Sequence, residues 1–147
     1  MRFLFPLMLL AFLTACVATP ETDVPAPAED AAVDAPLSLP PEDARSVEEF
    51  DTTSDVQRRE AADVSDGGVL LGQDVVTLGD PAQPGFWVQT ALVNAETSGR
   101  VELLGAGRGV EVTLIPTEGS GRISLAALRV LEIPLTDLVE VEIYDAQ

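Results

Sequence analysis

The residue with the clearest chemistry in this chain is its only cysteine, Cys16, which follows an apolar segment. A cysteine thiolate is a nucleophile that can be modified covalently. Arg2 supplies a positive charge before the apolar residues 3–12, and the small residues Thr14 and Ala15 stand directly before the cysteine. A membrane-spanning helix needs roughly 20 apolar residues. The shorter run is therefore typical of a secretory signal that is removed on export.

The segment "LTAC", residues 13–16, is similar to the bacterial lipobox. In that motif the cysteine sulfur receives a diacylglycerol before the peptide bond in front of it is cut. The alternative is an ordinary signal peptide with an accidental cysteine. A lone cysteine cannot form an internal disulfide, and a free thiol is a liability in oxidising surroundings, so lipidation of Cys16 is favoured. Val17 stands where an Asp commonly retains lipoproteins in the inner membrane, which favours the outer membrane of the cell envelope.

The charge balance excludes one class of partner. Asp and Glu number 25 against 8 basic residues, all of them Arg, and the formal net charge is −17. Nucleic-acid binding depends on Lys and Arg contacts to phosphate, and a strongly acidic surface repels phosphate. We therefore expect no nucleic acid as a partner. The expected partners are the membrane, through the lipidated N-terminus, and the cell wall or an envelope protein.

The chain divides into four segments. Residues 1–15 are the expected signal peptide. Residues 16–49 are rich in Pro, Ala and acids, so they bury too little apolar surface to fold and are expected to form a disordered tether. Residues 50–66 contain a short helix over 55–62, begun by a capping box of Ser54 and Gln57, and a connector. This helix is expected to be marginal and loosely docked, with Phe50 as its contact to the small β-rich domain, 67–147.

The domain has the pattern of a mostly β (α+β) fold. In residues 110–114 apolar and polar side chains alternate, as in a half-buried strand, and they alternate again in residues 139–144. A helix beginning at Ser124 places Leu125, Leu128 and Leu131 on one stripe. We expect a small curled sheet or β-barrel of about five antiparallel strands with one short helix before the last strand. The expected strands lie within residues 69–79, 86–93, 100–104, 109–115 and 139–144.

No residue pattern indicates catalysis, a metal or a cofactor. A serine nucleophile needs a base, and the chain has neither His nor Lys. Glu111, Glu140 and Glu142 occupy strand positions that alternation directs toward water. No spacing matches an oxygen-rich calcium loop. The glycine-rich residues 105–109 lie between two strands and are expected to form a hairpin turn, not a phosphate loop.

Two residues are candidates for a ligand or partner surface. Trp87, the only tryptophan, follows Phe86 and would suit stacking on a glycan; the alternative is an aromatic side chain in the core. Arg122 is a rare cation in an acidic domain; the alternative is an ion pair with a nearby acid.

Three segments resemble a group of short lipoproteins from Gram-negative bacteria that carry a galactarate-dehydratase-type family name. They are "EEFDTTSDVQRREAA", "LGDPAQPGFWVQTALV" and "GRISLAALRVLEIPLTDL". The name implies a sugar-acid lyase. Members of that enzyme family have longer chains and a metal-assisted elimination chemistry, for which this sequence offers no His, Lys or second Cys.

The C-terminal half is also similar to the double-psi β-barrel of rare lipoprotein A, a glycan-cleaving envelope lipoprotein. In that family an acid that donates the proton follows the arginine-containing strand. This chain has Ile123 and Ser124 at the matching place, so the resemblance implies only the fold. The favoured function is a non-enzymatic binding or structural module tethered to the outer membrane. The alternative is a small glycan-active hydrolase or a sugar-acid lyase.

Overall fold

The computed structural model describes residues 37–146, so the expected signal peptide, Cys16 and most of the expected tether lie outside the described residues. Within residues 37–146 no helix is long and apolar enough to cross a membrane. The elements follow one another as α1 (Val47–Phe50), α2 (Asp55–Ala62), β1 (Val69–Leu78), β2 (Trp87–Thr90), β3 (Thr97–Leu103), β4 (Gly109–Pro116), β5 (Gly121–Ile123), α3 (Leu125–Val130) and β6 (Val139–Asp145).

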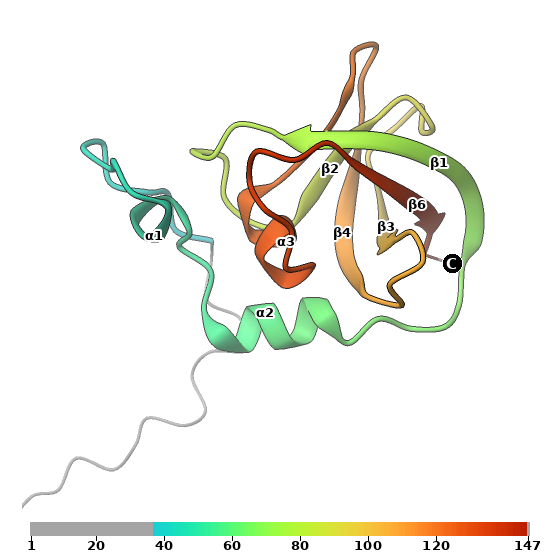
Figure 1. Ribbon diagram of the computed structural model, residues 1–147, viewed down its shortest axis with the longest axis horizontal. Helices are drawn as coiled ribbons and strands as arrows, with labels where there is room; N and C mark the ends of the chain where they lie inside the picture. The colour runs from blue at the N-terminus through green and yellow to red at the C-terminus, as the bar shows by residue number, and fades with distance from the viewer. Residues whose placement is uncertain (1–36, 147) are drawn as a thin grey trace, which may run out of the picture.

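The strands close into a barrel in the order β1-β5-β2-β4-β3-β6, with β6 paired to β1 (Figure 1). The expectation of a mostly β fold with a short helix before the last strand is confirmed. The number and direction of the strands differ from the expectation. β5, only three residues long, adds a sixth strand. β1 pairs with β5 in parallel, and so does β2 with β4.

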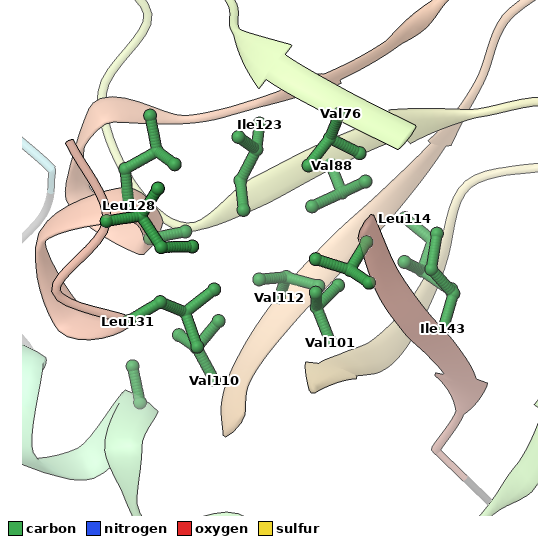
Figure 2. Close-up of a cluster of buried hydrophobic side chains, with 14 residues drawn as sticks. Val76, Val88, Val101, Val110, Val112, Leu114, Ile123, Leu128, Leu131 and Ile143 are labelled. Carbon is green, nitrogen blue, oxygen red and sulfur yellow. The ribbon is translucent and has the colours of Figure 1, made fainter. Parts of the chain in front are cut away.

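The alternating side chains fill the inside of the barrel. Val110, Val112 and Leu114 of β4 are buried, while Glu111 between them is exposed. Figure 2 shows inward-facing side chains from several strands meeting Leu128 and Leu131 of the α3 segment in one apolar cluster. The cluster contains Ala61, Val76, Val88, Val101, Val110, Val112, Leu114, Ile123, Ala127, Leu128, Leu131, Ile133, Val141 and Ile143.

Ser124 sets the start of α3 and ties the helix to the barrel. Its Oγ accepts a hydrogen bond from the backbone N–H of Ala127 at 3.2 Å and another from that of Trp87 at 3.2 Å. The first bond caps the helix, since the first N–H groups of a helix have no partner within it. The predicted leucine stripe is confirmed, because Leu125, Leu128 and Leu131 are all buried.

The glycine-rich residues 105–109 form the predicted hairpin turn between β3 and β4, which pair in antiparallel fashion. The backbone N–H of Leu103 donates to the carbonyl of Arg108 at 2.8 Å. Gly105 and Gly107 have φ of 75° and 62°, a left-handed conformation that glycine adopts at little cost.

The helix α2 occupies the predicted residues, and both hydrogen bonds of the predicted capping box are present. In Figure 1 it runs along one end of the barrel, next to α3. It is docked more closely than its poor apolar content predicted, because Ala61 is 6% exposed and belongs to the core cluster. The packed unit therefore includes residues that precede the expected start of the β-rich domain at residue 67. α1 forms within the last residues of the expected tether and at Phe50.

Candidate functional site

Trp87 lies on the outer side of β2 but is covered, so it does not belong to an open ligand surface. Its side chain is 3% exposed, and its Nε1–H donates to the carbonyl of Gln83 at 3.2 Å. The ring packs against Gly79, where an added Cβ would come within 2.3 Å of it. The structure thus corrects the interpretation of Trp87 as a stacking platform and agrees with the alternative of a packed aromatic side chain.

Arg122 is exposed on the outside of the barrel. It lies on β5 between Thr77 of β1 and Gln89 of β2 in the strand register. No carboxylate of residues 37–146 lies within ion-pair distance of its guanidinium. Arg122 therefore forms no ion pair with an acid of residues 37–146, and it remains a candidate for a ligand or partner surface. Cys16, the predicted lipidation site, lies outside the described residues.

A polar cluster that sequence reasoning missed joins the N-terminal segment to α3. We call it the Asp51 clasp: Asp51, Thr53, Arg58 and Arg129. The Asp51 side chain has 0% exposure. Its Oδ2 lies 3.0 Å from Nη1 of Arg58 in α2 and 2.9 Å from Nη1 of Arg129 in α3.

Thr53 completes the clasp from the same loop as Asp51. Its backbone N–H donates to Asp51 Oδ1 at 3.1 Å, and its hydroxyl donates to the same oxygen. Burial by itself would raise the pKa of Asp51, but the hydrogen bonds from Thr53 and Arg58 outweigh burial and leave the pKa below its ordinary value. Asp51 is therefore a carboxylate at neutral pH, and it neutralises part of the positive charge between the two helices.

Beside the clasp lies a shallow depression between α2 and the end of α3. Its volume is about 510 Å³, and it is lined by Asp55, Arg58, Arg59, Ala62 and Val130. Arg58 is held on one side of it, because Nη2 donates to Asp55 Oδ1 at 3.0 Å. Arg59 Nε donates to the backbone carbonyl of Asp55 at 3.1 Å. The depression thus combines two guanidinium groups with the apolar surfaces of Ala62 and Val130.

One carboxylate meets a buried hydroxyl on the barrel itself. Thr90, at the end of β2, is 0% exposed, and its hydroxyl donates to Asp74 Oδ2 at 2.8 Å. Gly121 leaves room for this carboxylate, since a Cβ there would lie 2.9 Å from Asp74 Oδ2.

The other strand acids mostly lie where alternation predicted. Glu111 and Glu140 are exposed, and Glu142 is partly exposed and accepts a hydrogen bond from the Tyr144 hydroxyl at 3.0 Å. Among residues 37–146 no group of three or more His, Cys, Asp or Glu side chains is placed to hold a metal ion.

No family model matches the chain, and no curated protein or solved structure was found to match it. The resemblances to the Gram-negative lipoprotein group and to the double-psi barrel thus stay predictions.

Proposed function

We propose that this chain is a lipid-anchored protein of the bacterial cell envelope whose folded domain binds a partner through its outer surface. The observation that carries the binding role is the filled barrel. Val88, Val101, Leu114, Ile123 and Ile143 are each 0% exposed and take up the interior. Protein interiors packed in this way leave no room for a ligand, so recognition belongs to the outside.

The anchor part of the proposal rests on the sequence. Cys16 follows an apolar run and two small residues in the "LTAC" segment, and it is the only cysteine. A lipid on this residue would hold the barrel at a membrane, and Val17 favours the outer membrane. The cell wall and envelope proteins are then the partners within reach.

Expression of the full chain in a Gram-negative host tests the anchor. Mass spectrometry of the membrane-extracted protein should identify an N-terminal Cys16 that carries acyl chains. Cys16→Ser should move the protein out of the membrane fraction. A wild-type protein that is soluble and begins at another residue would refute the anchor.

Cross-linking of the lipidated protein in intact cells, followed by its purification, tests the binding role separately. We expect one dominant cross-linked envelope partner or peptidoglycan fragment. If the protein is recovered without any cross-linked partner, under conditions where a known envelope complex is captured, the binding role would be contradicted.

A second candidate function is glycan cleavage or sugar-acid elimination, and the Asp74–Thr90 pair is the observation that favours it. Asp74 is a partly exposed carboxylate whose position is fixed by the Thr90 hydroxyl, and a positioned carboxylate can act as a general acid or base. The full chain should be incubated with peptidoglycan strands and with galactarate, with and without a divalent metal. Turnover that is lost in Asp74→Asn would establish this function in place of the first; binding without turnover supports the first.

A further inference from the structure

The lining of the α2–α3 depression differs in the sign of its charge from the chain as a whole. The chain as a whole has a formal net charge of −17. The residues that line the depression include two arginines, Arg58 and Arg59, and one acid, Asp55. The lining therefore carries a local formal charge of +1. The nearby Glu60 lines a different groove together with Phe86 and Glu111, on another side of α2.

The arginines around the depression keep unused hydrogen-bond donors. A guanidinium carries five N–H donors. Arg59 uses Nε alone within residues 37–146, and both of its terminal nitrogens are without a partner there. Arg129 is 37% exposed and is held to Asp51 through Nη1. The bond from Arg59 Nε to the Asp55 carbonyl fixes the position of that guanidinium, and Asp51 and Asp55 hold Arg58 beside it, so both arginines of the lining are oriented before any ligand arrives.

We propose that the α2–α3 depression binds a short acidic segment of a partner protein. In this proposal, which deepens the surface-binding function above and rests on it, a carboxylate pairs with the terminal nitrogens of Arg59. An adjacent apolar side chain packs on Ala62 and Val130. Arginine and carboxylate form two parallel charge-assisted hydrogen bonds, which favours this anion at an arginine with free terminal nitrogens.

The negative net charge of the whole molecule favours a short acidic peptide as the ligand over a large anionic surface. An anionic membrane or a nucleic acid would bring many negative charges against an acidic protein and would be repelled. A single peptide carboxylate needs only the local excess of positive charge. The apolar floor formed by Ala62 and Val130 adds a contact that an isolated inorganic anion would not use.

The test uses the full chain in mild detergent and a probe peptide, Glu-Leu-Glu-Leu-Glu-amide with a fluorescent dye on its N-terminus, and binding is measured by fluorescence anisotropy. The control peptide carries Gln in place of each Glu. We expect saturable binding of the acidic peptide, which weakens as salt is added. Arg59→Gln should weaken it about tenfold or more, because a charge-assisted pair is lost. Ala62→Glu, a change at an exposed position, should abolish it by placing a like charge on the floor.

Arg122→Gln is the matched control, since Arg122 is also exposed and without an ion pair among the described residues but lies on the barrel. It should bind the probe as the wild type does. Equal loss in Arg59→Gln and Arg122→Gln would mean diffuse attraction to any cation and would overturn the proposal. So would binding of the Gln peptide with the same affinity, or no binding by the wild-type chain.

A synthetic copy of residues 21–34, the chain's own acidic segment, is a separate arm. If that peptide binds at least tenfold more tightly than the probe and depends on Arg59, the site serves the chain itself and the partner proposal is overturned. Failure of every peptide leaves the acylation of Cys16 and the cross-linking of a partner as independent results, so failure of this inference is distinguishable from failure of the proposed function.

Discussion

At the scale of single residues, Asp51 contributes to stability through its charge as well as its hydrogen bonds. It lies in the loop between two short helices, and it binds one arginine from α2 and one from α3. Exposed ion pairs contribute little because water screens them. Here the Asp51 side chain is fully buried, while the side chains of Arg58 and Arg129 are 30% and 37% exposed. The arginines thus keep part of their hydration, and the acid depends on them for its solvation.

Asp51→Asn should therefore destabilise the protein by about 1–3 kcal/mol, less than the roughly 3–5 kcal/mol lost when a fully buried ion pair is broken. The amide can still accept from Thr53, but two guanidiniums lose their common counter-charge. Urea denaturation measures the effect. Asp55→Asn is the control: Asp55 also pairs with Arg58 but is 88% exposed, so a change within about 0.5 kcal/mol is expected. Equal effects of the two substitutions would contradict the clasp.

The same carboxylate predicts a dependence on pH. Its pKa is lowered in the folded protein, so its contribution is fully present above the unfolded value of about 3.9 and is lost as the pH falls through the lower folded value. The difference in unfolding free energy between wild type and Asp51→Asn should be constant near neutral pH and should shrink below about pH 4. Urea titrations at a series of pH values check this; a difference that grows on acidification would show the opposite sign.

The candidate residues show where sequence reasoning reaches its limit. Trp87 and Arg122 were chosen as candidates because tryptophan and arginine are rare in the domain. Only the folded chain reveals that the Trp87 ring is covered, with Gly79 packed against it, and that Arg122 is exposed to solvent. Asp51 gave no signal, because its partner Arg129 is far away in the sequence. The sequence shows Arg58 and Arg59 next to each other. It does not show that Arg58 faces inward to Asp51 while Arg59 faces outward.

At the scale of elements, α3 is the helix that closes the core at one end of the barrel. Ser124 caps it, and Leu128 and Leu131 face the inward valines of the strands (Figure 2). A strong local signal produced the correct prediction, since the cap and the 3.6-residue period agree over the same residues. Strand β5, directly before it, had no such signal. Three residues are too few to show alternation, and β5 is held by its neighbours β1 and β2.

Leu128→Ala should destabilise the protein by about 2–5 kcal/mol, because a large buried side chain is replaced and a cavity is left. Leu128 is 1% exposed. Small domains have a total stability of about 5–15 kcal/mol, so the melting temperature should fall markedly. Leu138→Ala is the matched control, since Leu138 is 76% exposed and should leave the melting temperature nearly unchanged. An unchanged melting temperature in Leu128→Ala would place α3 outside the core.

At the scale of the whole molecule, the barrel closes through pairings between strands that are distant in sequence. β6, the last strand, lies between β1 and β3, and the two parallel pairs join strands that are not consecutive. Composition and alternation predicted five of the six strands and the inward faces of β4 and β6. They did not predict the order or direction of pairing, because a strand's own period does not depend on which neighbour it meets. Within residues 37–146, closure of the barrel leaves no edge strand free to pair with another chain.

The N-terminal segment belongs to the same packed unit, which leads to a prediction for the intact chain. Ala61 lies in the core, and Asp51 is tied to α3. A protease that cuts exposed, unpacked backbone should therefore stop before Asp51, and the resistant fragment should retain α2. Limited proteolysis with mass spectrometry of the fragment ends measures the boundary. In Asp51→Asn, cleavage between Asp51 and Val69 should become faster, because the segment loses its hold on α3. A wild-type fragment that begins near Val69 would show that the strands alone form the stable unit and that the clasp contributes little.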